Sequence, residues 1–210
     1  MARCVLIGGA EIKNYHWIKK QLQSDDFYIF CDSGLRHSQP LGISPHLIVG
    51  DFDSTENPHL SVETIVLPRE KDDTDSVYGV KEGLKRGFTD FVFLGVIGGR
   101  LDHSLGNLSI LYYLHVQGGK GIIFDDYSSI ELVTSKKAYV KDTVEYFSVL
   151  SIFGKSSGIT IKNAKYPLVN GKIDMDYQYG ISNEVLSGKV AEISVKKGEL
   201  LLIKVYTEKL

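Results

Sequence analysis

The stretch "HLIVGDFDS", residues 46–54, joins an apolar run directly to two carboxylates, Asp51 and Asp53. The unbroken apolar run predicts a short strand that is buried on both faces, as in a parallel sheet. In an extended chain, residues two positions apart point to the same side, so both carboxylates would face one cation. They are equally compatible with a surface turn, in which aspartate is common. Taken alone, the stretch favours the turn.

Apolar segments of the same kind recur over the first 128 residues and alternate with segments of helical periodicity. The expected strands cover residues 3–9, 27–34, 46–51, 62–68, 90–99 and 120–126, and the expected helices cover 13–23, 74–86 and 105–119. Short apolar strands that alternate with helices predict a doubly wound, mostly parallel sheet. We therefore expect an α/β domain over residues 1–128.

The remaining residues, 129–210, follow a different pattern. Their apolar segments are short, rich in β-branched and aromatic residues, and separated by turn-forming residues. These segments cover residues 129–134, 137–141, 145–153, 158–164, 184–198 and 199–207. None of them has helical periodicity, so this part of the chain predicts an all-β sandwich domain.

Composition narrows the classes of function. The formal net charge of −2 over 210 residues gives no basic excess, so we expect no nucleic-acid partner. No apolar run reaches the ~20 residues that span a bilayer, and no signal segment opens the chain, which favours a cytoplasmic protein without a membrane partner. Cys4 and Cys31 both lie in apolar segments, where buried, reduced thiols are expected.

Polar motifs follow four of the expected parallel strands, at the edge where open α/β sheets usually bind ligands. The motifs are "CDSG" (31–34), "GDFDS" (50–54), "REKDDTDS" (69–76) and "GGRLDH" (98–103). Each motif alone is better explained by a turn or by the start of a helix. Together they would bring to one edge Asp32, Asp51, Asp53, Asp72, Asp75 and Asp102, with Arg69, Lys71 and Arg100 among them. Such a concentration of carboxylates favours a bound divalent cation, and oxygen ligands around a phosphate chain favour Mg²⁺.

The familiar phosphate-binding loops are absent from the sequence. There is no GxxxxGK[ST] motif, and the glycine pair at residues 8–9 is too short for GxGxxG. A bound nucleotide would therefore need a metal ion, Arg or Lys side chains, and the backbone amides of glycine-rich turns at residues 8–9, 34 and 98–99.

The order of the motifs resembles the thiamine pyrophosphokinase family. "CDSGL", "PHLIVGDFDS", "KDDTDS" and "GGRLDHSLGN" are followed by "KYPL" (165–168) and "GISNE" (180–184), so the resemblance extends over almost the entire chain. It implies the Mg²⁺-dependent transfer of pyrophosphate from ATP to the hydroxyl of thiamine, giving thiamine diphosphate and AMP. It also implies a homodimer, in which an α/β catalytic domain and the partner's thiamine-binding β-sandwich build each active site together.

The motifs at the strand ends and the resemblance together assign expected roles to individual residues. The expected metal ligands are Asp51, Asp53 and Asp75. The expected nucleotide-binding residues are Asp32, Gly34, Asp72, Thr74, Gly98, Gly99 and Asn107. The expected catalytic residues are Asp75, Arg100 and Asp102. Asp102 would also face thiamine, while Ser182 and Asn183 would line the pyrimidine pocket from the partner subunit. Two points stay open, namely whether Asp75 or Asp102 orients the hydroxyl proton, and whether Leu186 or a tyrosine packs on the pyrimidine where some relatives use a tryptophan.

Two other functions compete with this interpretation. One is a diphosphokinase of the same architecture that acts on another small alcohol, such as a hydroxymethylpterin. "GISNE" argues against it, because the resemblance places that motif in the thiamine-binding half. The other is a non-catalytic module that binds nucleotide or metal at its acidic edge.

Overall fold

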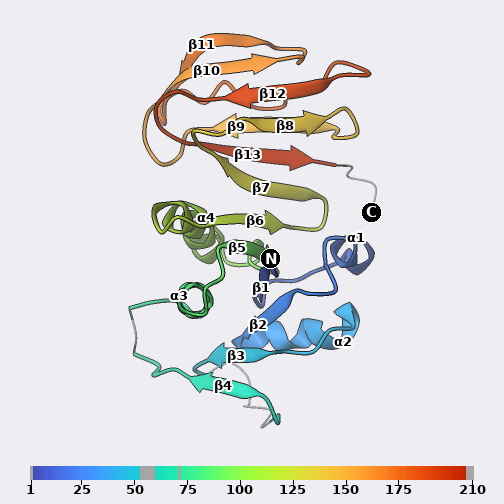
Figure 1. Cartoon of the computed structure of the whole chain (residues 1–210), viewed down its shortest axis with the longest axis vertical. Coiled ribbons are helices and arrows are strands. Elements are labelled where there is room, and N and C mark those ends of the chain that lie inside the picture. The colour runs from blue at the N-terminus through green and yellow to red at the C-terminus, as the bar shows by residue number, and fades with distance from the viewer. Residues whose placement is uncertain (1, 53–59, 71, 207–210) are drawn as a thin grey trace. The chain divides into compact units, whose positions relative to one another are not determined.

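The computed structural model of the protein describes residues 2–52, 60–70 and 72–206 (Figure 1). They form two compact units that divide between Asp126 and Tyr127. The domain limits 1–128 and 129–210 stay a prediction from the sequence.

The first unit contains a parallel sheet with helices on both faces (Figure 1). Its elements are β1 (Cys4–Ile7), α1 (Tyr15–Lys19), β2 (Phe27–Cys31), the 3₁₀ helix η1 (Asp32–His37), α2 (Ser38–Leu41), β3 (Leu47–Gly50), β4 (Glu63–Val66), α3 (Asp75–Lys85), β5 (Asp90–Leu94), α4 (Leu101–Val116) and β6 (Lys120–Phe124). The strand order is β4-β3-β2-β1-β5-β6, and every pair is parallel. The order reverses between β1 and β5, the position at which doubly wound sheets bind ligands.

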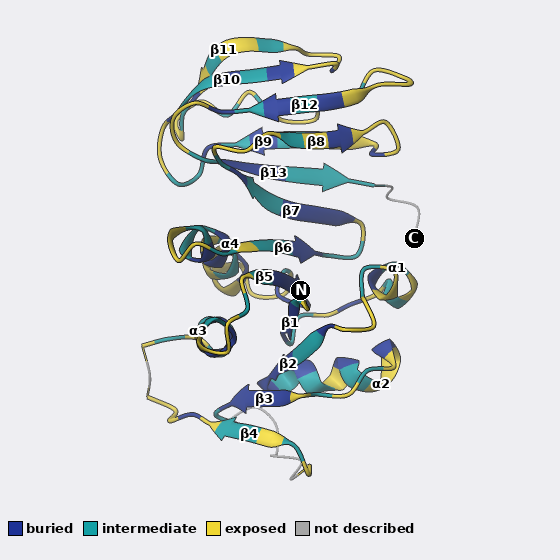
Figure 2. Cartoon of the chain, in the orientation of Figure 1, coloured by how far each residue is buried: buried dark blue, intermediate teal, exposed yellow. Residues whose placement is uncertain are grey.

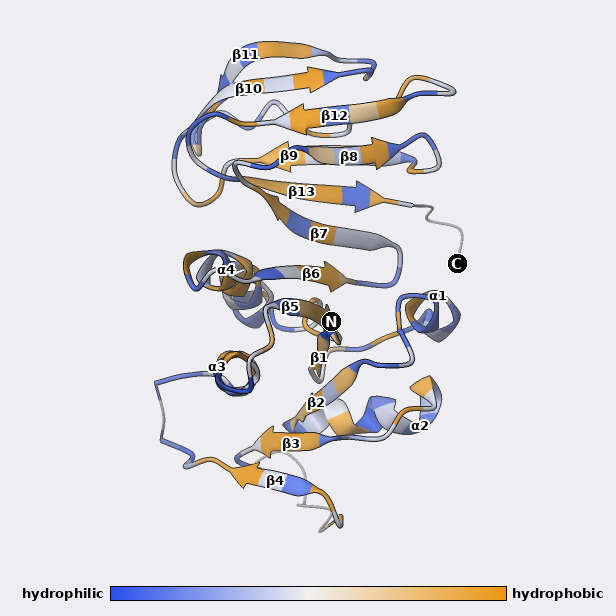
Figure 3. Ribbon diagram, viewed as in Figure 1, coloured by the Kyte–Doolittle hydropathy of each residue, from blue (hydrophilic) through white to orange (hydrophobic). Residues whose placement is uncertain are grey.

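The two faces of this sheet follow from the alternation of side chains along each strand. Val5 and Ile7 of β1 pack in a core with Ile18 of α1 and Leu41 of α2. Cys4 and Leu6 point to the opposite face, where α3 lies. The central strands are therefore apolar and buried throughout, as Figures 2 and 3 show for β1 and β3. The expected doubly wound α/β fold is confirmed.

Several expected elements have different limits in the structure. The helix expected over 13–23 covers only Tyr15–Lys19, and at its start Asp126 Oδ1 accepts the N–H groups of Lys13 and Asn14 at 2.8 Å, which holds them outside the helix. The second strand ends at Cys31 and continues as η1, since Asp32 has a φ of 38°. Conversely, α4 begins at Leu101, four residues earlier than expected.

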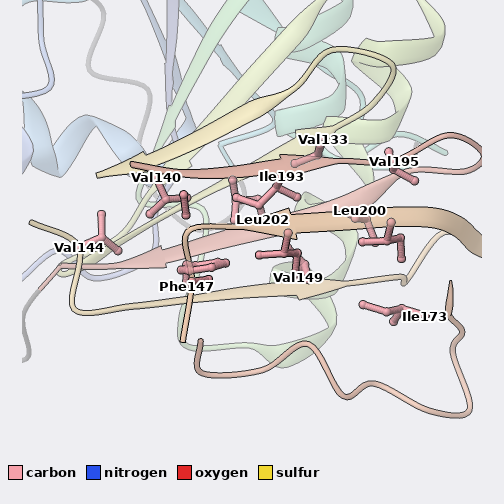
Figure 4. Packing of buried hydrophobic residues seen from close by; sticks show 14 residues of the cluster. Val133, Val140, Val144, Phe147, Val149, Ile173, Ile193, Val195, Leu200 and Leu202 are labelled. Carbon is pink, nitrogen blue, oxygen red and sulfur yellow. The ribbon is translucent and has the colours of Figure 1, made fainter. Parts of the chain in front are cut away.

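The second unit contains only strands. They are β7 (Ser128–Val133), β8 (Ala138–Lys141), β9 (Tyr146–Leu150), β10 (Ser156–Lys162), β11 (Leu168–Ile173), β12 (Val190–Ser194) and β13 (Leu200–Val205). One antiparallel layer has the order β7-β13-β9, and the other has the order β11-β10-β12-β8. Both layers contribute to one core, in which Ile193 of β12 packs with Leu202 of β13 (Figure 4). This is the expected β-sandwich.

The structure adds β11, which the sequence pattern does not predict. Its centre is Asn170–Gly171, a pair typical of turns, and Asn170 has a φ of 52°. The strand lies at the edge of its layer and pairs only with β10. An edge position tolerates residues that would disrupt a central strand.

The structure also bears on the expectations for the two cysteines and for membrane-spanning segments. Cys4 and Cys31 are buried free thiols, as expected. Burial raises the pKa of Cys4 to about 12 and raises the pKa of Cys31 well above its usual range. Over the described ranges, no helix is long and apolar enough to cross a membrane. The cytoplasmic location stays a prediction.

Close packing of α3 on the sheet gives a test of the fold with two matched glycines. A Cβ at Gly83 of α3 would lie 2.7 Å from Phe91 Cε1 and 3.1 Å from Cys4 Sγ, whereas a Cβ at Gly106 of α4 would meet open space. We expect Gly83→Ala to lower the free energy of unfolding by about 2 kcal/mol through overpacking. Gly106→Ala should raise it by about 0.5–1 kcal/mol, because alanine is the better helix former. Urea unfolding of both variants measures this; equal effects of the two would contradict the packing described.

Candidate metal and phosphate site

Three carboxylates meet at the carboxyl edge of the parallel sheet. They belong to Asp32 after β2, Asp51 after β3 and Asp75 at the start of α3. Each offers an oxygen, and these oxygens all lie within 4.8 Å of one another. Asp32 is buried, with 8% of its surface exposed, and the other two are half-buried. Like charges this close and this poorly hydrated repel one another, and a cation relieves that repulsion.

The cluster fits Mg²⁺ by its donors and by its spacing. Carboxylate oxygens are hard ligands of the kind that Mg²⁺ prefers. Ligands on opposite sides of one Mg²⁺ lie about 4 Å apart, because each metal–oxygen distance is about 2.1 Å. The three oxygens are therefore close enough to one another for the carboxylates to share one ion.

Asp32 occupies its place through unusual backbone geometry. Its φ of 38° is disfavoured for any residue with a Cβ. Two glycines permit this conformation. A Cβ on Gly50 would lie 3.0 Å from Asp32 Cβ, and one on Gly34 would lie 2.2 Å from the Ile7 carbonyl oxygen. Gly34, expected to contact nucleotide, is thus required by the packing of η1 against β1.

The neighbourhood of Asp51 corrects one expectation. The sequence predicts that Asp51 and Asp53 face the same side across an extended Phe52. Instead β3 ends at Gly50, and Phe52 has a φ of 53°, so the chain is not extended there. The argument from alternation is therefore wrong at this point. Asp53 itself lies outside the described residues, and its role as a metal ligand stays a prediction.

Asp75 is placed by the start of α3. Thr74 is the N-cap, and its Oγ1 accepts the N–H of Val77 at 3.4 Å. A carboxylate in the first turn is favoured by the helix dipole. Asp73 is directed elsewhere, since its Oδ2 pairs with Lys81 Nζ at 2.5 Å, and Asp72 is exposed. Of the acidic residues in "DDTD", Asp75 is the one that joins the cluster.

Close backbone contact marks the reversal of strand order. The N–H groups of Gly8 and Ala10 donate to the carbonyls of Leu94 and Gly95 at 2.8 Å. A Cβ on Gly8 would lie 2.6 Å from the Gly95 oxygen, and a Cβ on Gly95 would lie 2.6 Å from the Gly8 oxygen. Only glycines fit here. The loop after β1 is therefore held firmly against β5 at the edge that carries the carboxylates.

A second glycine turn precedes α4. Gly98 and Gly99 have φ values of 113° and 65°, in the left-handed region that favours glycine. Ser104 Oγ accepts the Gly98 N–H at 3.0 Å, and Asn107 Nδ2 donates to the Val96 carbonyl at 2.7 Å. Asn107, expected to contact nucleotide, thus ties α4 to the segment after β5.

Arg100 and Asp102, expected as catalytic residues, form an ion pair with each other at the start of α4. Arg100 Nε and Nη2 donate to the two Asp102 oxygens at 3.1 and 2.6 Å. Both side chains are exposed, by 71% and 65%. The bonds from Arg100, together with one from the His103 N–H, lower the pKa of Asp102 to about 2. An exposed pair of this kind is easily opened by a competing anion or by salt.

Ser182 and Asn183, which are expected to bind thiamine, lie in the second unit and differ in their surroundings. Asn183 is buried, and its side-chain amide makes three hydrogen bonds to the backbone. Its Oδ1 accepts the N–H groups of Tyr166 and Glu184, and its Nδ2 donates to the Tyr166 carbonyl at 2.8 Å. Ser182 is exposed, with a φ of 56°, and its N–H donates to Ser148 Oγ. Asn183 therefore fixes the segment, and Ser182 is presented on the surface.

Sequence patterns gave no signal for three residues that hold this region together. Ser104 orders the glycine turn, and His37 and Tyr15 form a hydrogen-bonded pair beneath the loop after β1. A single histidine or serine in a helix carries no distinctive spacing. The one available hint is that His37 follows the motif "CDSG" by three residues.

Comparison with known proteins places the chain in a family. A family model described as "Thiamin pyrophosphokinase, catalytic domain" matches residues 18–123, and one described as "Thiamin pyrophosphokinase, vitamin B1 binding domain" matches residues 133–200. The chain belongs to the thiamine pyrophosphokinase family. The expected family membership is thus confirmed. The catalytic match falls on the unit with the carboxylate cluster, and the binding match falls on the unit with Ser182 and Asn183.

Individual members of the thiamine pyrophosphokinase family are similar in sequence and fold. The thiamine pyrophosphokinase of Bacillus subtilis is 29% identical over 185 residues, which cover 84% of this chain and 86% of that protein. A crystal structure of the Bacillus subtilis protein has a TM-score of 0.86 at 23% identity, covering 98% and 99% of the two chains. The yeast structure has a TM-score of 0.78 at 15% identity, covering 100% and 88%.

The ion pair at the start of α4 gives a test by titration. Arg100→Met should raise the pKa of Asp102 from about 2 toward its ordinary value of 3.8, because the strongest hydrogen bonds to the carboxylate are lost. NMR titration of the Asp102 carboxyl carbon measures the change. Lys85→Met is the control, because it removes an exposed positive charge at the carboxyl end of a different helix, α3, and should leave the pKa of Asp102 unchanged. An Asp102 that titrates alike in Arg100→Met and the control would show that the pair is absent in solution.

Proposed function

We propose that the chain transfers pyrophosphate from ATP to the hydroxyl of thiamine, with Mg²⁺, and releases AMP and thiamine diphosphate. The observation that carries this proposal is the carboxylate cluster of Asp32, Asp51 and Asp75, in a chain of this family. The cluster lies at the edge of the sheet where doubly wound folds bind nucleotides. The relatives named above as thiamine pyrophosphokinases support the same reaction.

The three carboxylates would hold Mg²⁺, with Asp53 as a further ligand predicted from the sequence. Bound there, the ion would neutralise oxygens of the triphosphate and favour departure of AMP. The residues of this chain then have mainly to position the substrates, since transfer of this kind needs in-line alignment more than strong base assistance. Backbone amides of the turn at Gly98–Gly99 are proposed to approach the phosphates, and Asp72 and Thr74 to flank the nucleotide.

Arg100 and Asp102 are proposed to separate when substrates bind. Arg100 would stabilise charge on the phosphates, and Asp102 would then face the thiazolium cation of thiamine. Even without Arg100, a carboxylate with the ordinary pKa of 3.8 is a poor proton acceptor at neutral pH, and Asp102 is exposed, so it suits attraction of a cation better than base catalysis. We therefore assign orientation of the hydroxyl proton to Asp75.

We also propose that two copies of the chain assemble, so that Ser182 of one protomer contributes to the site of the other. The second unit exposes several large apolar side chains around its edge strand and the segment after it, which is typical of surfaces that bind another protein. They include Tyr166, Val169, Met175, Tyr177 and Ile181. A second copy would cover this surface.

The proposed reaction is tested by its products. Incubation with ATP, Mg²⁺ and thiamine should yield AMP and thiamine diphosphate, measured by chromatography. AMP should not form when thiamine is omitted or replaced by a hydroxymethylpterin. Formation of ADP would exclude pyrophosphate transfer, AMP with the pterin alone would favour the related diphosphokinase, and no turnover would favour a binding module.

Two neighbouring aspartates give a matched test of the cluster. Asp75→Asn should lower kcat/KM by at least about 100-fold, because it removes a ligand of the metal that stabilises the transition state. Asp73→Asn removes one charge from the same motif but only an exposed pair with Lys81, and should change kcat/KM less than about threefold. Circular dichroism checks that both variants are folded. Near-normal turnover by folded Asp75→Asn would rule out its metal role.

A shared active site predicts complementation between inactive variants. Asp75→Asn damages the site of its own protomer, and Ser182→Trp blocks the surface that a protomer lends to its partner. Unfolding the two variants together and refolding them should restore activity, up to about a quarter of wild type, since mixed dimers contain one intact site. Sedimentation at several concentrations measures the assembly. An active monomer, or mixtures no more active than their parts, would refute the shared site.

A further inference from the structure

We propose that His37 is a positioning residue, which fixes η1 to the loop after β1 and thereby holds Asp32 in the metal cluster. Its consequences for catalysis rest on the proposed function, whereas its consequences for metal binding do not. His37 is not among the site residues expected from the sequence. It lies at the far end of the 3₁₀ helix that Asp32 begins.

The histidine ring joins two other segments of the first unit. Only 1% of His37 is exposed. Its Nε2 lies 2.9 Å from the Ala10 carbonyl oxygen, and its Nδ1 lies 2.7 Å from the Tyr15 hydroxyl. Tyr15 opens α1, and Ala10 belongs to the loop after β1. One buried side chain therefore links η1, the loop and α1.

The partners determine which nitrogen carries the proton. A carbonyl oxygen only accepts, so Nε2 must donate to Ala10. In the neutral ring Nδ1 then accepts, and the Tyr15 hydroxyl donates to it. Burial lowers the pKa of His37, which favours this neutral form at physiological pH. The ring thus acts as a fixed bridge with one donor and one acceptor, a task that an apolar residue of similar size would not perform.

Asp32 needs such a bridge because its own conformation is unfavourable. A φ of 38° is disfavoured for a residue with a Cβ, and such geometry persists only where the surroundings enforce it. At the start of η1, Gly34 packs on the Ile7 carbonyl. At its end, Arg36 Nη2 donates to the Gly9 carbonyl, and His37 donates to the Ala10 carbonyl. The side chain of Arg36 is exposed, so His37 supplies the buried anchor.

The loop itself is held from two directions. The N–H groups of Gly8 and Ala10 donate to the last residue of β5 and to the residue that follows it, while the carbonyls of Gly9 and Ala10 accept from η1. Loss of the His37 bond would leave the Ala10 carbonyl without its buried donor and release η1 from the loop. Movement of η1 would displace the Asp32 carboxylate, because the 3₁₀ helix begins at that residue.

Two substitutions each keep one of the two hydrogen bonds of His37 and remove the other. Glutamine places its amide nitrogen near the position of Nε2, so His37→Gln keeps the donor to Ala10. Asparagine places its amide oxygen near the position of Nδ1, so His37→Asn keeps the acceptor for Tyr15 and loses the bond to Ala10. Tyr15→Phe removes one hydroxyl. Tyr28→Phe, its control, removes a hydroxyl that donates to the Gln23 carbonyl at the opposite end of β2.

The primary measurement is the affinity for Mn²⁺, determined by electron paramagnetic resonance of the free ion in titrations of the whole chain. We expect His37→Asn to weaken Mn²⁺ binding about tenfold, the effect of one lost buried hydrogen bond, and His37→Gln to stay within about threefold of wild type. Tyr15→Phe loses the same bond as His37→Gln and should likewise weaken Mn²⁺ binding about two- to threefold, whereas Tyr28→Phe should leave it unchanged. In the kinase assay, His37→Asn should raise the KM for Mg²⁺-ATP more than the KM for thiamine, and His37→Gln should rescue it.

The outcomes distinguish this inference from the proposed function. Equal Mn²⁺ affinities in His37→Asn and His37→Gln, with lowered Tm alone, would reduce His37 to a packing residue. If His37→Asn does not fold, equal affinities in Tyr15→Phe and Tyr28→Phe would overturn the inference. A wild type that binds Mn²⁺ but forms no AMP with thiamine would refute the proposed reaction and leave the positioning role supported. A wild type that binds no Mn²⁺ would overturn both.

Discussion

Repulsion among the carboxylates of Asp32, Asp51 and Asp75 is the constraint on which the first unit depends. Two unit charges 4.8 Å apart repel by about 3–4 kcal/mol at an effective dielectric constant of 20. A flexible backbone would relax and separate them. Here Asp32 and Asp51 follow directly on the buried strands β2 and β3, and Asp75 begins α3, so relaxation would have to disturb hydrogen-bonded strands or a capped helix. The rigidity of the sheet is what makes the charged cluster possible.

Glycine is the means by which the sheet becomes rigid at this edge. Gly8 and Gly95 bring two backbones so close that no side chain fits, and Gly34 does the same between η1 and β1. These contacts shorten the distance between elements that carry polar residues. They also explain why the motifs are rich in glycine although no familiar phosphate loop is present. Part of what resembles a ligand-binding signature is packing.

The fold and the general location of the site follow from local patterns, whereas the details depend on tertiary contacts. The change in apolar pattern near residue 128 predicts the folds of both domains. Strands buried on both faces give continuous apolar runs, whereas strands buried on one face alternate apolar and polar residues. The positive φ values at Asp32 and Phe52 leave no such pattern, and at Asp32 the conformation depends on close contact with Gly50, 18 positions away in the sequence. Strand β11 is missed because Asn170–Gly171 resembles a turn. The bridge made by His37 joins residues 27 positions apart, which no local pattern encodes.

The side-chain amide of Asn183 makes the hydrogen bonds that a neighbouring strand would otherwise make. Its amide accepts from the Tyr166 N–H and donates to the Tyr166 carbonyl, the two bonds that a neighbouring peptide group would make in a sheet. The segment can therefore leave the regular ladder at Ser182 without losing hydrogen bonds. Ser182 and Asn183 are neighbours in one motif, yet the Ser182 side chain is exposed, whereas Asn183 is buried and stabilises the backbone. Substitution of Ser182 therefore leaves these backbone bonds intact, whereas substitution of Asn183 removes the bonds that hold the segment in place.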